Sequence, residues 1–241
     1  ATPPLSVHAC VEASRWCWFG LFVGSRKPTL VLPNLYIGGI TTDRTFYSKN
    51  RITHVVSLCG ATPPLSVRVN RLHVPFWDCP CSDLGSRTKA VVQFIHQARL
   101  TGGSVLVHCM QGVSRSSAMV ISYIMASQEM KFQEAFAYLK SKRWRVHPNP
   151  GFQEQLRSSF DYRGVSLCLA NINASDESRK VVVREDSACI DAWRASLPVK
   201  IKRSTPSSSP DIENSRARLI NSQQPRGGDE YGAGNDGGKD D

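Results

Sequence analysis

A cysteine and an arginine are spaced in this sequence so that both could act on one phosphate group. Five residues separate Cys109 from Arg115, and the apolar run Val105–Val107 before them predicts a buried strand. A helix is expected from Arg115 to about Ser127. A helix N-terminus and consecutive backbone N–H groups attract an anion, and an arginine donates two parallel N–H bonds to phosphate oxygens. The spacing therefore indicates a phosphate-binding loop.

The same loop is suited to activating Cys109 as a nucleophile. A thiol at a helix N-terminus beside a cation has its pKa lowered from roughly 8.5 into the ~3.5–7.5 range, so it ionises near neutral pH. Gly112 allows the tight backbone conformation that such a loop needs. A thiolate next to a bound phosphate is placed to attack phosphorus.

The elements that position this loop are expected to alternate between short strands and helices. Apolar runs predict strands, and apolar residues at helical spacing with caps and stop signals predict helices. The expected strands cover residues 30–38, 54–58, 71–76 and 104–107. The expected helices cover residues 43–50, 86–100, 115–127, 132–139 and a last segment ending near 162. This order predicts an α/β domain with a central, mostly parallel sheet flanked by helices.

The regular pattern covers only the middle of the chain. Residues 1–27 form an N-terminal extension of unclear structure, and residues 28–163 carry the folded domain. We expect residues 164–241 to be a largely disordered C-terminal extension, because its last part is rich in Ser, Pro, Gly and Asp. Two apolar segments of it, 181–183 and 190–197, leave docking on the domain open.

Composition narrows the class of protein. The net charge is +10, and the basic excess falls within 28–163. Such a domain suits nucleic acid, an anionic membrane or phosphorylated substrates, or merely has a soluble basic surface. No apolar run reaches the ~18 residues of a membrane span. Eight cysteines in 241 residues are too few for a disulfide-stapled secreted domain, and their spacing matches no zinc site. These features favour a reducing, intracellular compartment.

The sequence around the loop resembles the cysteine-based protein tyrosine phosphatases. The stretch from His108 to Ser116, His-Cys-Met-Gln-Gly-Val-Ser-Arg-Ser, is most similar to the dual-specificity branch. Further segments also match that branch: 35–38, 52–56, 73–78 and 149–156. The resemblance covers residues 28–163 and implies a protein tyrosine phosphatase-like fold. Because only 27 residues precede it, we expect one of the small atypical members rather than the kinase-docking class.

The resemblance implies a role for each residue of the site. Cys109 attacks phosphorus to form a phosphocysteine intermediate, and Arg115 binds the phosphate. Asp78 acts first as acid and then as base. Ser116 assists breakdown of the intermediate, caps the following helix, or does both. The phosphate-binding residues are Met110, Gln111, Gly112, Val113, Ser114 and Arg115.

Some neighbouring positions have competing interpretations. Asp83 is the other candidate for the acid. It stands near the start of a predicted helix, so capping that helix suits Asp83 better than the role of acid, and Asp78 is favoured as the acid. Ser114 either donates a hydrogen bond within the loop or only packs. By resemblance, His108 orders the loop and tunes Cys109 rather than acting as a base.

A second cysteine is expected close to the loop. Cys59 ends a predicted strand, and the carboxyl ends of parallel strands meet at one edge of a sheet. Some relatives form a reversible disulfide between such a cysteine and the nucleophile, so Cys59 either protects Cys109 in this way or is an ordinary buried cysteine. Cys79 and Cys81 are weaker candidates for that partner.

The function implied by the resemblance is hydrolysis of phosphotyrosine and phosphoserine or phosphothreonine in proteins, without a metal or other cofactor. The expected substrate is a phosphorylated protein, for which a MAP kinase pathway member is a candidate. The expected location is the cytoplasm, the nucleus or both. Neither a nucleic-acid partner nor a membrane span is expected.

Three other functions use the same fold. Phosphoinositide phosphatases of this family often carry lysines in the loop, whereas residues 110–114 contain neither Lys nor His. RNA phosphatases show a different loop pattern. Phosphate-binding adaptors lack the cysteine, the arginine or the acid, whereas all three are present in this sequence.

Overall fold

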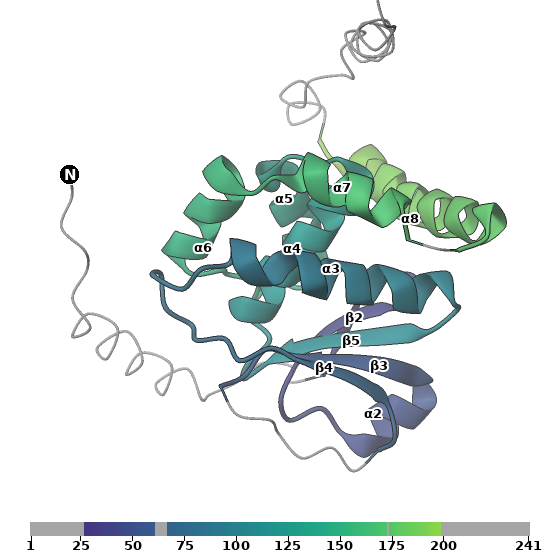
Figure 1. Cartoon of the computed structure of the whole chain (residues 1–241), viewed down its shortest axis with the longest axis horizontal. Coiled ribbons are helices and arrows are strands. Elements are labelled where there is room, and N and C mark those ends of the chain that lie inside the picture. Colours follow the sequence, from purple (N-terminus) through teal and green to yellow (C-terminus); the bar gives the residue numbers. More distant parts are fainter. Residues whose placement is uncertain (1–26, 61–66, 173, 199–241) are drawn as a thin grey trace, which may run out of the picture. The chain divides into compact units, whose positions relative to one another are not determined.

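A five-stranded sheet forms the centre of the computed structural model, which describes residues 27–60, 67–172 and 174–198 (Figure 1). The strand order is β1-β2-β5-β3-β4, and the bounds in that order are Thr29–Leu32, Leu35–Gly39, Ser104–Cys109, Ile52–Ser57 and Asn70–His73. Strands β2, β5, β3 and β4 pair in parallel, and β1 pairs antiparallel with β2. The predicted α/β fold with a mostly parallel sheet is confirmed.

Helices cover both faces of this sheet. Figure 1 shows α2 on one face and the later helices on the other. The helical segments are α2 Arg44–Lys49, α3 Gly85–Leu100, α4 Arg115–Gln128, α5 Phe132–Lys142, α6 Pro150–Glu154, the π-helical turn η1 Gln155–Ser159, α7 Tyr162–Ala170 and α8 Asp176–Ser196. Among these described helices, none is long and apolar enough to cross a membrane.

The main core lies between the sheet and the later helices. Helix α4 is buried from Arg115 to Ala126, as expected for a helix in the centre of a layer rather than at its surface. Strand β5 is buried at every position, because both of its faces are covered. The nucleophile candidate Cys109 and the arginine that starts α4 are thus carried by the two most buried elements.

The structure divides the strand expected at residues 30–38 into β1 and β2. Pro33 and Asn34 form the turn between them, and Asn34 has a φ of 59°. Proline has no N–H for the strand ladder, and asparagine tolerates the left-handed region better than most residues. The prediction of one strand over residues 30–38 overlooked these two turn residues, and therefore missed the hairpin of β1 and β2.

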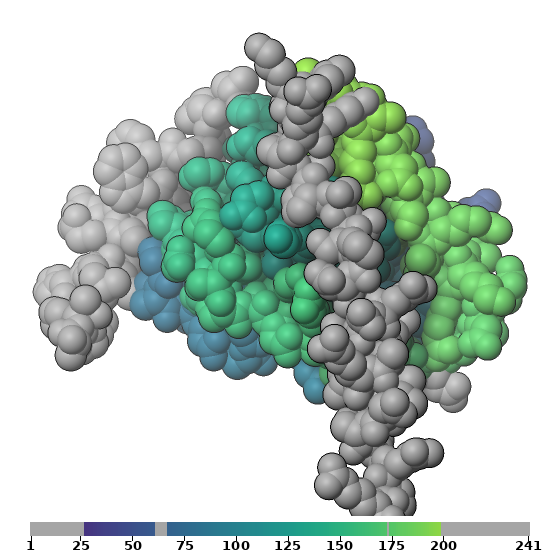
Figure 2. All heavy atoms as spheres, turned by 90° about the horizontal axis from the view of Figure 1, so that it is seen from above, coloured from purple at the N-terminus to yellow at the C-terminus, as the bar shows by residue number. Residues whose placement is uncertain are grey.

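The structure also corrects the disorder expected directly after residue 163. Helix α7 runs across that position, and α8 follows it on the helical side of the domain, in green and yellow-green in Figure 2. Ile190 of α8 is 1% exposed and belongs to the main core. The docking left open for 190–197 is therefore present, because α8 has an apolar face that needs cover. For residues 199–241 the expected disorder lies outside the described residues, and so do residues 1–26 of the N-terminal extension.

Candidate active site

The loop from Cys109 to Arg115 lies against the end of the neighbouring strand. Gly39 of β2 pairs with Cys109 of β5, and the Ile40 N–H donates to the Met110 carbonyl at 3.2 Å. Gly112 has a φ of +71°, and a Cβ there would lie 2.5 Å from the Gly38 carbonyl oxygen. Both the backbone angle and the close approach require glycine.

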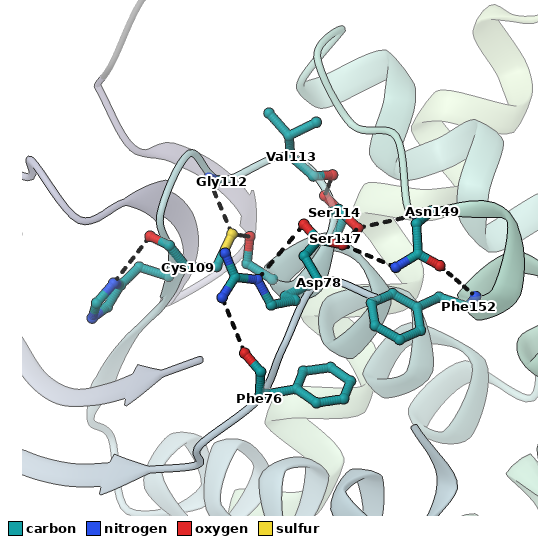
Figure 3. A network of polar contacts seen from close by, with 12 residues as sticks. Phe76, Asp78, Cys109, Gly112, Val113, Ser114, Ser117, Asn149 and Phe152 are labelled. Atoms are coloured by element: carbon teal, nitrogen blue, oxygen red, sulfur yellow. Dashed lines mark hydrogen bonds and ion pairs between the residues drawn. The ribbon is translucent and has the colours of Figure 1, made fainter. Parts of the chain in front are cut away.

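Cys109 occupies the centre of this loop, where its sulfur meets hydrogen-bond donors. The Gly112 N–H donates to Cys109 Sγ at 3.3 Å, and Ser116 Oγ lies 3.3 Å from the same sulfur (Figure 3). Burial alone would raise the pKa of Cys109, but the Arg115 charge, the Ser116 hydroxyl and backbone N–H groups outweigh it and lower that pKa. The site therefore stabilises a thiolate.

Arg115 is buried at the start of α4 beside the sulfur. Its Nη1 donates to the Phe76 carbonyl at 3.0 Å, and its Nε lies 3.6 Å from Asp78 Oδ2. That Nε is buried and has no hydrogen-bond partner among the described residues. A buried donor of this kind needs an acceptor, which an oxygen of a phosphate in the loop would supply.

Asp78 reaches the loop through two neutral partners. Ser114 Oγ donates to Asp78 Oδ1 at 2.6 Å, and Asn149 Nδ2 donates to the same oxygen at 2.9 Å (Figure 3). The Asn149 N–H in turn donates to Ser114 Oγ at 3.0 Å. Ser114 therefore does more than pack: it connects the carboxylate to the loop. Asp78, Ser114 and Asn149, which come from three separate segments, are fixed relative to one another.

Asp83 has a different environment. Its Oδ1 accepts the Ser86 N–H at 3.2 Å in the first turn of α3, and the side chain is exposed. Asp83 precedes the N-cap residue Leu84, and its carboxylate accepts an N–H of the first helical turn, as a capping side chain does. Ser116 lies within α4 and Ser114 occupies the N-cap position, so the alternative interpretation of Ser116 as the cap is wrong.

His108 is buried behind the loop. Its Nε2 lies 2.7 Å from Ser57 Oγ, and its Nδ1 lies 3.4 Å from the Cys109 carbonyl oxygen. Arg71 Nε donates to the same serine oxygen at 3.1 Å. Burial lowers the pKa of His108 to about 4, so the ring is neutral at pH 7. A neutral ring bound to the backbone of the loop can order Cys109 without carrying charge.

The comparisons with known proteins decide the family. Residues 35–161 match the family model described as "Dual specificity phosphatase, catalytic domain". This chain belongs to the dual specificity phosphatase family. Its domain is therefore that of a protein-tyrosine/serine/threonine phosphatase, and its substrates are phosphorylated proteins.

Individual relatives agree with this family assignment. Dual specificity protein phosphatase 22-A of Danio rerio is 37% identical over 150 residues, which are 61% of this chain and 72% of that protein. Dual specificity protein phosphatase 15 of Rattus norvegicus is 39% identical over 130 residues, 53% of this chain and 55% of that protein. The crystal structure of DUSP15 superposes with a TM-score of 0.60 at 30% identity, covering 62% of this chain and 99% of that one.

The cysteines of this phosphatase domain differ in state. Cys59 is buried and free, and burial followed by the charge of Cys109 raises the pKa of Cys59. Its pairing with Cys109 stays a prediction. Cys79 and Cys81 form a disulfide with each other, directly after Asp78, so in this structure neither is a free thiol available to Cys109.

The sequence motifs contained further site residues to which no role was assigned. Asn149 and Gly151 fall within the matched segment 149–156, and Asn149 proves to hold Asp78. Arg143 lies outside every matched segment, yet its Nε donates to the Gly112 carbonyl at 3.1 Å. Arg143 is identified only by its buried position beside the loop in the structure, because the spacing of residues in the sequence gives no signal of that position. Among the described residues, no cluster of three or more His, Cys, Asp or Glu side chains could hold a metal ion.

Proposed function

We propose that this phosphatase works through a phosphocysteine intermediate formed on Cys109. The thiolate attacks phosphorus, the bond to the ester oxygen breaks, and Asp78 gives that oxygen its proton. Asp78 then removes a proton from the water that attacks phosphorus, and the Cys109 thiolate leaves. Arg115 and the backbone N–H groups of residues 110–115 bind the phosphate oxygens throughout.

One observation carries this proposal: the sulfur of Cys109 lies among donors that favour its anionic form. Arg115, the Ser116 hydroxyl and the Gly112 N–H all stabilise a negative charge at one point. The Ser116 contact also supports its assisting role, because a hydroxyl that donates to the sulfur makes the thiolate a better leaving group in the second step.

The protein substrate we propose is a phosphorylated member of a MAP kinase pathway, met in the cytoplasm, the nucleus or both. The support is the resemblance of the sequence to the dual-specificity branch, together with a net charge of +10 that attracts anionic partners. A doubly phosphorylated MAP kinase activation-loop peptide is the first substrate to test. Phosphoinositide and 5′-triphosphate RNA substrates serve as comparisons, and preferential turnover of either would contradict this substrate class.

The mechanism is tested by hydrolysis of an aryl phosphate in the presence of EDTA and a reductant. We expect activity in the wild type, none in Cys109→Ser, and a kcat lowered by about 100-fold in Asp78→Asn, the range for loss of a general acid. Asp83→Asn is the matched control and should keep wild-type kcat, because Asp83 contacts the start of α3.

Two results would contradict the proposal. An inactive but folded and reduced wild type would favour the adaptor function instead. A large loss in Asp83→Asn with little change in Asp78→Asn would assign the acid to Asp83.

A further inference from the structure

Arg143 is a buried cation directly behind the catalytic loop. The residue is 5% exposed and follows the last residue of α5. Its Nε donates to the Gly112 carbonyl, and its Nη1 donates to the Lys27 carbonyl and to Thr29 Oγ1, each at 3.0 Å. No carboxylate among the described residues forms an ion pair with it. Burying an arginine against neutral acceptors costs free energy, so the position calls for a reason.

The peptide between Gly112 and Val113 supplies that reason. A trans peptide is planar, so its carbonyl and its N–H point in opposite directions. When Arg143 holds the Gly112 oxygen on the outer side of the loop, the Val113 N–H must point to the inner side. That N–H is one of the groups that favour the Cys109 thiolate.

The other contacts of Arg143 make it a rigid support. Its guanidinium is shared between the loop and the start of the described chain, where it reaches Lys27 just before β1 and Thr29, the first residue of β1. The segment that carries Arg143 also holds the next peptide of the loop, because the His147 N–H donates to the Val113 carbonyl at 2.9 Å. A planar guanidinium can serve acceptors in two directions at once, which a lysine ammonium on a flexible stem does with less fixed geometry.

We propose that Arg143 is a positioning residue of this phosphatase: by holding the Gly112 carbonyl outward, it turns the Val113 N–H toward the Cys109 thiolate and the phosphate. It acts through the loop and does not touch the substrate. This inference rests on the proposed role of Cys109 as the nucleophile. The positive charge of Arg143 also favours the Cys109 thiolate, since the two charges attract each other.

The test measures the ionisation of Cys109 directly. The rate of Cys109 alkylation by iodoacetamide is followed against pH by peptide mass mapping, together with kcat and KM for an aryl phosphate. In Arg143→Met we expect the alkylation midpoint to rise by about one pH unit, which corresponds to about 1.4 kcal/mol. We also expect kcat/KM to fall about tenfold or more.

Two further variants separate geometry from charge. Arg143→Lys keeps the charge but not the planar fork, so its midpoint should lie between those of wild type and Arg143→Met. Arg145→Met removes a guanidinium two residues away, one that stacks on Trp144 at 5.9 Å. The Arg145→Met variant should keep the wild-type dependence of Cys109 alkylation on pH and the wild-type kcat and KM.

Three outcomes would overturn the proposal. The first is an unchanged alkylation midpoint in folded Arg143→Met. The second is a wild-type midpoint in Arg143→Lys, which would mean that only the charge of Arg143 acts. The third is a shift in Arg145→Met as large as that in Arg143→Met, which would mean that any nearby positive charge acts. If Arg143→Met does not fold, Arg143→Lys decides. Alkylation needs no Asp78 and no turnover, so a wild type with a low midpoint but no hydrolysis would sink the proposed function and leave the role of Arg143 measurable.

Discussion

The candidate acid Asp78 is joined to the phosphate-binding loop through one hydroxyl group, that of Ser114. Ser114 Oγ donates to Asp78 and accepts from the Asn149 N–H. Both bonds use the same oxygen. Loss of the hydroxyl would therefore leave Asp78 Oδ1 with only the Asn149 amide as a hydrogen-bond donor among the described residues, and would leave the Asn149 N–H without this acceptor. The position of the acid therefore depends on a residue that itself carries no charge.

Ser114→Ala should therefore impair the acid more than phosphate binding. We expect kcat to fall about tenfold with KM nearly unchanged. The loss should be larger for phenyl phosphate than for p-nitrophenyl phosphate, since the poorer leaving group needs the proton more. Ser122→Ala, which removes a hydroxyl bonded to the Ala118 carbonyl inside α4, is the control. An equal loss with both leaving groups would contradict the role of Ser114.

Cys59 carries a second prediction at this scale. It is buried and free, and burial, followed by the charge of Cys109, raises the pKa of Cys59. After mild peroxide treatment we expect a linked Cys59–Cys109 peptide in the wild type and irreversible loss of activity in Cys59→Ser. Peptide mapping and recovery of activity with a thiol reductant measure both, and finding no linked peptide would reject the idea.

Among the elements, α6 approaches the segment that carries the acid unusually closely. A Cβ on Gly151 would lie 2.1 Å from the Pro80 carbonyl oxygen. Asn149 caps α6 by accepting the Phe152 N–H at 3.0 Å and donates its amide to Asp78. The start of one short helix thus positions the acid both by a hydrogen bond and by backbone contact.

Gly151→Ala should displace the Pro80 backbone and with it Asp78. We expect kcat to fall about tenfold, and the free energy of unfolding to fall by about 1–3 kcal/mol from overpacking. Gly85→Ala is the matched control, because its Cβ would meet only Asp83 Oδ1 at 3.5 Å. Steady-state kinetics and urea unfolding of both variants measure this. A Gly151→Ala enzyme with wild-type kcat would show that the contact does not position the acid.

In the domain as a whole, α8 is attached by a buried ion pair far from the catalytic loop in sequence. Asp186 accepts from both terminal nitrogens of Arg99, at 2.7 and 2.6 Å, and Asp186 is fully buried. Arg99 also donates to the Pro33 carbonyl and to Tyr123 Oη. This network joins α8 to α3, to α4 and to the turn between β1 and β2.

Asp186→Asn should destabilise the domain without changing its chemistry. Removing one partner of a buried pair leaves the other charge uncompensated and costs about 3–5 kcal/mol. We expect this loss in the free energy of unfolding, measured with urea, and unchanged kcat and KM below the transition. Glu185→Gln, an exposed neighbour, should leave stability unchanged. Equal stabilities of the two variants would mean that the Arg99–Asp186 pair contributes little to the attachment of α8.

The sequence by itself determined the catalytic loop, because the loop is built from consecutive residues. Strand, cysteine, glycine and arginine stand in one short stretch. Their spacing, together with the predicted strand before them and helix after them, predicted that Cys109 and Arg115 could act on one phosphate. The alternation of strands and helices likewise predicted the sheet. Asp78 lies in a matched motif, which made it a candidate for the acid. The motif did not show which groups hold its carboxylate.

Only the tertiary structure decided which distant groups complete the site. Asn149 reaches Asp78, Arg143 reaches Gly112, and Asp186 of α8 reaches Arg99. Each of these pairs depends on where a side chain points after the layers have packed, and hydrophobic periodicity records which face is buried but not which polar group faces it. Residues adjacent in sequence therefore supply the proposed nucleophile and the proposed phosphate-binding loop, whereas packing supplies the groups that hold both in place.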